Sequence, residues 1–284
     1  MQKFLIPLSI VIAGACIAGA IYFTQSPQGG FTYSSNYTPI RTVQDNDHIV
    51  GNKDADVIVF EYTDPECPYC KVFHQTMQEI MNTAQEQGDS VAWVYRHFPI
   101  PQLHPKAPSE ALALECAAAQ GGNDMFWQYT NAVYETTNSN NSLDIGVYNT
   151  PEEIPTGQDG KPWYTETAPT SKTDAGQLSD IASSLGLDVA QFEQCMVDAA
   201  QMDQIQADAS EAVAAGAQGT PFNVIMAKKD LSSKAKTAIA SLPSNAGISL
   251  LDKKTVAVPG AYPKAVVQQV IDVMLGKTDT ITLQ

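Results

Sequence analysis

The pattern of residues 57–96 constrains the fold more than any other part of the chain. Val57–Tyr62 is a run of β-branched and aromatic residues typical of a buried strand, and residues 91–96 form a second such run. Between them, residues 67–85 carry apolar side chains at helical spacing, and Gly88 ends that helix. A strand, a helix and a strand in this order predict a βαβ unit with two parallel strands.

The remaining sequence extends this unit in two blocks. Residues 108–216 are predicted to be helical, with an irregular excursion at 138–172 rich in Asn, Thr, Pro and Gly. Residues 217–284 return to strands at 222–226 and 255–258, with a helix and loop inserted at 230–247, and end in an amphipathic helix at 262–275. The predicted order is therefore βαβ in residues 47–107, a helical subdomain, and ββα.

The N-terminal segment differs from the rest of the chain. Residues 4–23 contain no charge and follow Lys3, which predicts a single-pass membrane anchor over residues 1–24 with the remainder exported. Two alternatives are a signal peptide cut after Ala20 and lipidation at Cys16. Residues 25–46 are polar and without periodicity, so we expect a flexible tether.

The charge balance limits the partners that this chain can bind. The 284 residues carry a formal net charge of −15. An acidic surface repels phosphate, which argues against nucleic-acid binding, and the composition indicates no basic patch for anionic lipid.

Export places the other cysteines in an oxidising compartment, where disulfides persist. The four are Cys67, Cys70, Cys116 and Cys195. One close pair and one distant pair suit one catalytic and one structural bridge, although two unpaired buried thiols at 116 and 195 are the alternative.

The spacing of Cys67 and Cys70 fits zinc, haem or thiol exchange. Haem attachment needs a histidine directly after the second cysteine, where Lys71 stands. Zinc needs about four ligands, and only His74 is near enough in sequence to add a third. Thiol exchange fits better, because Cys67 lies where a strand ends and a helix begins. Unpaired N–H groups and the helix dipole at that point favour a thiolate.

Three further features accompany the cysteine pair. Pro68 suits a first helical turn, and Cys70 lies one turn inside the helix as the resolving thiol. Glu61 stands in the first apolar strand, so we interpret it as a buried proton acceptor for Cys70 rather than a strand-end glutamate that reaches solvent. Thr220–Pro221 begins a strand, where a cis bond would leave the Thr220 backbone free for an extended substrate, but sequence alone favours the trans form.

In these motifs the chain resembles the DsbA-like branch of the thioredoxin superfamily. The matching segments run in order over residues 48–275: Gly51–Ala55, Phe60–Cys70, Tyr95–Pro99, His104–Pro105, Ala111–Ala117, Gly219–Phe222 and Val258–Ala261. The resemblance implies an α/β thioredoxin fold with a central mixed sheet and an inserted all-helical subdomain. It also implies that Cys67 is the nucleophile, that Glu61 is the buried acid and that Thr220–Pro221 is cis, with Pro68 and Tyr69 at the substrate surface.

The activity implied is a protein disulfide oxidoreductase that donates its Cys67–Cys70 disulfide to reduced exported polypeptides. Its implied partner is a membrane quinone-linked reoxidant of the DsbB or VKOR type. We expect a monomer with no metal or other cofactor, held in the cell membrane with its catalytic domain on the periplasmic or extracellular side. The alternatives are an isomerase or reductase of the same fold, a glutaredoxin-like enzyme, and a non-catalytic metal-binding or docking module. Pro68-Tyr69 departs from the Pro-His pair of the best-known strong oxidants.

Overall fold

The computed structural model describes residues 31, 33–34, 37–136 and 177–282. The predicted anchor at 1–24 and the excursion at 138–172 lie outside the described residues, so both stay predictions. Within the described ranges no helix is both long and apolar enough to cross a bilayer. Residues 33–284 form one compact unit, and the description that follows concerns this unit.

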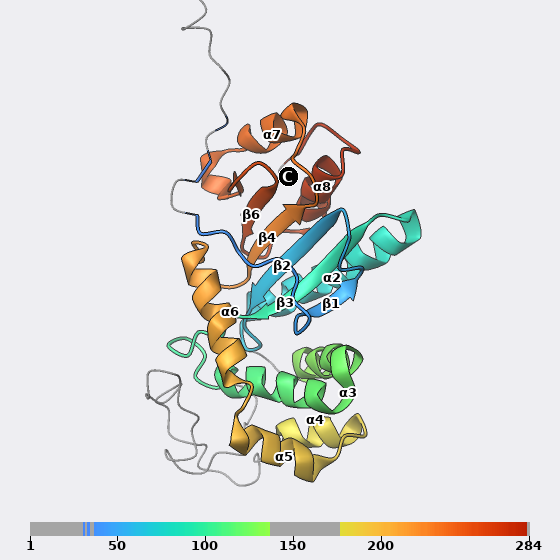
Figure 1. Cartoon of the computed structure of the whole chain (residues 1–284), viewed down its shortest axis with the longest axis vertical. Coiled ribbons are helices and arrows are strands. Elements are labelled where there is room, and N and C mark those ends of the chain that lie inside the picture. The colour runs from blue at the N-terminus through green and yellow to red at the C-terminus, as the bar shows by residue number, and fades with distance from the viewer. Residues whose placement is uncertain (1–30, 32, 35–36, 137–176, 283–284) are drawn as a thin grey trace, which may run out of the picture. The chain divides into compact units, whose positions relative to one another are not determined.

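A six-stranded mixed sheet is the centre of this unit (Figure 1). Its strands are ordered β1-β3-β2-β4-β6-β5, and β2 and β3 are parallel while the other neighbours are antiparallel. The strand bounds are His48–Gly51 for β1, Val57–Thr63 for β2, Val91–His97 for β3, Phe222–Ala227 for β4, Ser249–Leu250 for β5 and Thr255–Pro259 for β6. The predicted βαβ unit and the mixed sheet are confirmed, whereas the sequence did not indicate β1 or β5.

Helices lie on both faces of the sheet and at one end of it. α2 follows β2 directly and packs with α8, whereas α6 packs against β2 and β3. α3, α4 and α5 gather beyond β1 and β3 as the helical subdomain (Figure 1). The helix bounds are Pro68–Gln87 for α2, Ala107–Thr136 for α3, Gln177–Ser184 for α4, Val189–Asp198 for α5, Met202–Ala214 for α6, Ser233–Ala240 for α7 and Lys264–Met274 for α8, with a 3-10 turn at Ser244–Ala246. α3 is interrupted at Gly122, where the backbone φ is 65°.

The central strand β2 is covered on both faces. Its Phe60 and Tyr62 pack with Val94 and with small residues of α6. On the opposite face, the Trp93 ring of β3 contacts rings of α2 and α3. Seven consecutive residues from Val57 to Thr63 are therefore buried or nearly so, and any polar group on this strand needs a partner within the protein.

Part of the predicted tether is fixed to the domain instead of being flexible. Ile40 is buried in the cluster beneath α6. The Arg41 guanidinium pairs with Asp208 at 2.5 Å and with Glu211 at 3.0 Å. The tether prediction is therefore wrong from about Tyr37 onward, because these residues have partners about 170 positions away in sequence that local composition cannot reveal.

A disulfide joins Cys116 of α3 to Cys195 of α5, across a sequence separation of 79 residues. It holds two helices of the helical subdomain together. Loop-closure entropy for a cross-link of this length corresponds to about 4 kcal/mol.

We predict that Cys116→Ala/Cys195→Ala lowers the free energy of unfolding by about 2–4 kcal/mol, because the unfolded chain regains the entropy of the open loop. Urea unfolding followed by circular dichroism measures the loss. The matched control is the unmodified chain under reducing conditions, which should lose a similar amount. Equal stability of variant and parent in oxidising buffer would contradict this account.

A buried ion cluster joins the N-terminal segment, β3 and α6. The Arg96 guanidinium has no exposed surface and pairs with Asp47 at 2.8 Å and with Glu211 at 2.7 Å. The Tyr62 hydroxyl donates to Glu211 at 2.6 Å. Removing Arg96 leaves Asp47 without its ion-pair partner at a largely buried position.

We predict that Arg96→Met costs about 3–5 kcal/mol of stability, because Asp47 loses its counter-charge and Glu211 keeps only the partly exposed Arg41 as its ion-pair partner. Arg41→Met is the matched control, since the Arg41 side chain is 39% exposed and its loss should cost about 1 kcal/mol. Urea unfolding of the two variants tests the difference, and equal losses would contradict it.

Candidate active site

Cys67 caps the N-terminus of α2, as predicted. Its backbone is extended, with φ −71° and ψ 123°, and Pro68 occupies the first helical turn. Cys67 and Cys70 are both reduced in this structure. The side chain of Tyr69 between them is 67% exposed, so the dipeptide presents an aromatic ring to solvent beside the thiols.

The Thr220–Pro221 bond is cis and lies beside the cysteines. The Sγ of Cys67 is 3.5 Å from the carbonyl oxygen of Thr220. β4 begins at the next residue, Phe222, and pairs with β2 along its length. The structure thus brings the first residues of β4 to the same end of the sheet as the start of α2.

Hydrogen bonds lower the pKa of Cys67 to about 6. The largest contribution comes from the Cys70 thiol, and others come from Thr220 and from the first backbone N–H groups of α2. Burial opposes the shift without cancelling it. Cys67 is therefore largely a thiolate at neutral pH, the species that attacks disulfides and leaves them most readily.

Cys70 is in the opposite situation. It has no exposed surface, and burial raises its pKa well above that of a free thiol. The adjacent charge of Cys67 raises the pKa further. Its sulfur accepts a hydrogen bond from the backbone N–H of Asp64 at 3.5 Å and packs against Tyr134 of α3. The pair thus consists of one ionised and one protonated sulfur.

Glu61 is completely buried, as the sequence predicted. The indole N–H of Trp93 donates to its Oε2 at 2.8 Å, whereas Oε1 makes no well-aligned hydrogen bond among the described residues. Burial raises the pKa of Glu61 to about 8, and hydrogen bonds from Thr63 and Trp93 limit the rise. A carboxyl group with this pKa can give or take a proton near neutral pH.

Asp64 connects two loops beside the cysteine pair. Its carboxylate accepts hydrogen bonds from the backbone N–H of Glu66 at 2.9 Å and of Ile100 at 2.8 Å, and it also contacts Nδ1 of His104 at 3.0 Å. This contact raises the pKa of His104. Asp64 therefore fixes the loop between β2 and α2 to the loop after β3. In the sequence, the one feature that could have indicated this role of Asp64 is its position as a charged residue at the end of a buried strand.

His74 of α2 is buried against α3. The ring is 2% exposed and contacts Oδ1 of Asn131 in α3 at 2.7 Å. Burial lowers its pKa to about 4, so the ring is neutral at pH 7.

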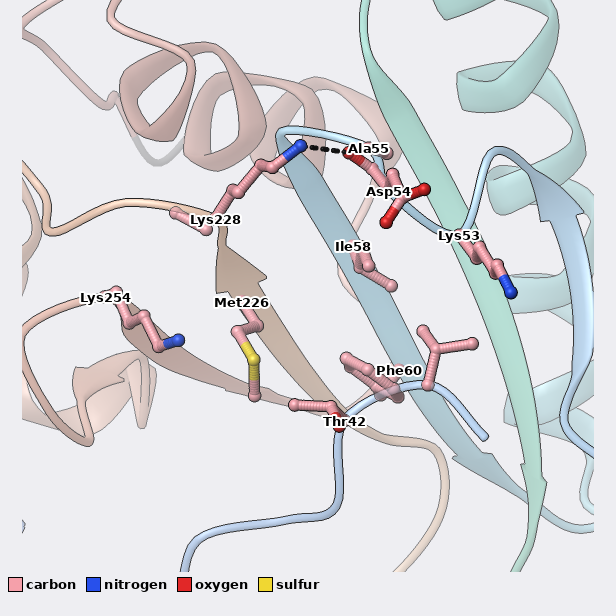
Figure 2. Close-up of a pocket in the computed structure, with 11 residues that line it drawn as sticks. Thr42, Lys53, Asp54, Ala55, Ile58, Phe60, Met226, Lys228 and Lys254 are labelled. Carbon is pink, nitrogen blue, oxygen red and sulfur yellow. Dashed lines mark hydrogen bonds between the residues drawn. The ribbon is translucent and has the colours of Figure 1, made fainter. Parts of the chain in front are cut away.

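A separate cavity of about 400 Å³ lies near the start of β2, whereas the cysteines follow the end of that strand. Figure 2 shows three apolar residues that line it, Ile58, Phe60 and Met226. Lys53, Lys228 and Lys254 stand around it, and Lys228 Nζ donates to the carbonyl oxygen of Asp54 at 2.9 Å. Three lysines thus line one cavity of a chain whose composition is strongly acidic. This cavity is not part of the cysteine site.

Comparison with known proteins adds three findings. A family model described as Thioredoxin matches residues 43–238. A Na(+)/H(+) antiporter NhaA 1 of Mycolicibacterium vanbaalenii is 36% identical over 91 residues, which are 32% of this chain and 14% of that protein. The chain thus matches only a small part of that curated relative.

Two solved structures share the fold. α-DsbA1 of Wolbachia pipientis has 22% identity and a TM-score of 0.54, covering 83% of this chain and 94% of that one. DsbA2 of Pseudomonas aeruginosa has 21% identity and a TM-score of 0.52, covering 81% and 95%. At this level of identity the likeness establishes the architecture alone.

We predict that Glu61→Gln stabilises the protein by about 2–3 kcal/mol at pH 7. Since the folded pKa of about 8 exceeds the ordinary value of 4.5, the unfolded chain releases this proton first, and stability falls as the pH rises through that window. Near pH 4 the gain should vanish. Urea unfolding at several pH values tests this, with the exposed Glu86→Gln as control. A gain that does not depend on pH would contradict burial as the cause.

Proposed function

This chain belongs to the thioredoxin family, and on that premise we propose that it is a protein disulfide oxidoreductase acting through Cys67 and Cys70. The observation that carries the proposal is the asymmetry of the two sulfurs. Cys67 lies at the start of α2 with a pKa near 6, and Cys70 is buried behind it with a raised pKa. One sulfur is suited to exchange with a substrate and the other to resolve the intermediate.

Disulfide donation proceeds in two exchanges. A substrate thiolate attacks Cys67 Sγ of the oxidised pair, the Cys67–Cys70 bond breaks, and its electron pair goes to Cys70, which takes up a proton. A second substrate thiolate then attacks the substrate sulfur, and Cys67 leaves as a thiolate. The substrate gains a disulfide and the protein becomes a dithiol. The low pKa of Cys67 favours this direction, because the better leaving group is the one that departs.

The same pKa sets an expectation for the oxidising strength. A thiolate stabilised in the reduced form makes the disulfide easier to reduce and hence a stronger oxidant. A pKa near 6 lies below the ~7 of thioredoxin and above the ~3.5 of DsbA. We therefore infer a reduction potential between ~−270 and ~−120 mV, the values of those two proteins.

The surface around Cys67 suits an extended polypeptide. The ring of Tyr69 is exposed, and a cavity of about 470 Å³ extends from Thr220 and Pro221 towards β5 and β6. We propose that reduced exported polypeptides are the substrates and that Pro68, Tyr69, Thr220 and Pro221 contact them.

The cellular setting follows from the N-terminal sequence. We propose that residues 1–24 hold a monomeric domain in the cell membrane, with Cys67 on the periplasmic or extracellular side. A membrane quinone-linked protein of the DsbB or VKOR type would then reoxidise the pair. The uncharged run from Phe4 to Phe23 supports this placement.

We predict that Cys67→Ser abolishes oxidation of a reduced two-cysteine peptide, whereas Cys70→Ser accumulates mixed disulfides, because the resolving thiol is missing. Mass spectrometry after acid quenching measures both species. Cys116→Ser/Cys195→Ser is the control and should retain exchange if it folds. Failure of Cys70→Ser to trap any adduct would show that the two roles are assigned wrongly.

Equilibration with glutathione separates the competing activities. A potential near −120 mV with rapid peptide oxidation indicates a donor, and one near −270 mV indicates a reductase. Metal binding by the dithiol without any exchange would indicate a non-catalytic module instead.

A further inference from the structure

We propose that Asp64 is a positioning residue of the resolving step, because its carboxylate holds its own backbone N–H against Cys70 Sγ, where negative charge develops. The inference rests on the proposed function, since it concerns the moment at which the Cys70 thiolate attacks the mixed disulfide of Cys67. Asp64 stands directly after β2, at the junction with the loop that leads into α2.

The peptide bond between Thr63 and Asp64 lies between β3 and the resolving sulfur. Its carbonyl oxygen accepts a hydrogen bond from the backbone N–H of Phe98 at 2.8 Å. Its N–H, on the opposite side of the same planar unit, donates to Cys70 Sγ at 3.5 Å. The positive end of this peptide dipole therefore points at the sulfur that must become an anion.

The side chain of Asp64 fixes the residue that carries this N–H. Its Oδ1 accepts the backbone N–H of Glu66 at 2.9 Å, and its Oδ2 accepts that of Ile100 at 2.8 Å. The same Oδ2 contacts Nδ1 of His104 at 3.0 Å. Asp64 has no exposed surface, so both oxygens are held by protein groups. A rotation of the Asp64 backbone would break bonds to two loops at once.

The backbone carbonyl of Asp64 reaches the other cysteine. It accepts the N–H of Cys67 at 3.2 Å and the hydroxyl of Tyr134 at 3.4 Å. Asp64 therefore binds both cysteines, the first through its carbonyl oxygen and the second through its N–H.

This arrangement matters because Cys70 must ionise in a dry place. The side chain has no exposed surface, and burial raises its pKa well above that of a free thiol. A donor that is already oriented stabilises a developing anion without any rearrangement, and removal of such a donor slows reactions by about a hundredfold or more. Replacing the Asp64 side chain leaves the N–H in place but frees its direction, so a smaller loss is expected.

The charge of Asp64 acts in the opposite direction. Its carboxylate raises the pKa of Cys70, so by charge alone the loss of Asp64 would speed up resolution. The contact with Asp64 also raises the pKa of His104, whose protonated ring offsets part of that charge. Other ionisable groups that interact electrostatically with Cys70 come from α2, β3 and α3, and from the residue before α2: Cys67, Tyr95 and Tyr134. Burial raises the pKa of both tyrosines, which stay neutral. Positioning and charge therefore predict opposite signs for the loss of Asp64.

The test measures how fast Cys70 resolves a mixed disulfide when Asp64 is replaced. The reduced full chain in detergent is mixed in a stopped-flow instrument with a substoichiometric amount of dithiobis(nitrobenzoate). Attack by Cys67 releases one nitrothiobenzoate. The Cys70 thiolate then attacks Cys67 Sγ, the mixed disulfide breaks, and a second nitrothiobenzoate leaves as a thiolate. We expect Asp64→Ala to slow the second release about tenfold at neutral pH and to displace its pH profile to higher pH, with the first release changed less than about threefold.

Two further variants make the test specific. Asp64→Asn removes the charge and keeps one acceptor oxygen, so its second release should lie between those of the parent and Asp64→Ala. Arg41→Met, which lowers stability away from the cysteines, should keep the parental rate. Should Asp64→Ala fail to fold, Asp64→Asn carries the test, and a slower second release is expected there as well.

The outcomes separate the two proposals. A second release that is unchanged or faster in a folded Asp64 variant would overturn the positioning role and leave thiol exchange standing. Absence of a second release and of peptide oxidation in the unmodified chain would instead overturn the proposed function.

Discussion

The central place of β2 in the sheet is the constraint on which the site depends. With β3 and β4 on its edges and helices over both faces, six of the seven residues of this strand are buried. Among the described residues Glu61 has no ion-pair partner, and the indole N–H of Trp93 is its aligned hydrogen-bond donor. A carboxyl group in such a place resists ionisation and retains its proton up to about pH 8. The two sulfurs therefore lie near a carboxyl group that is protonated at neutral pH.

Local sequence patterns predicted the strand and helix that carry the cysteine pair, whereas contacts between residues far apart in sequence could not be predicted. The start of α2 at Cys67 could be predicted, because a proline and a change from strand to helix periodicity stand within a few residues. The contact between Trp93 and Glu61 could not, since it depends on the register of β2 against β3. The burial of His74 could not be predicted either, because it depends on a contact with Asn131, which lies 57 positions later in the sequence. The fixed part of the N-terminal segment was missed for the same reason.

The two cysteine pairs differ in what surrounds them. Cys67 meets hydrogen-bond donors at a helix start, which stabilise its reduced form. Cys116 is buried between α3 and α5 and is joined to a residue far away in sequence, so breaking that bond frees a long loop. The Cys116–Cys195 disulfide joins two helices, whereas Cys67 and Cys70 are free thiols at the start of one helix, and the pKa of Cys67 is lowered there.

The attachment of Arg41 to α6 places the start of the folded domain before its first strand. Arg41 pairs with Asp208 and Glu211 of α6, and Asp47 pairs with Arg96 of β3. A version of the domain cut to begin at β1 would therefore leave Asp208 and Arg96 each without one ion-pair partner.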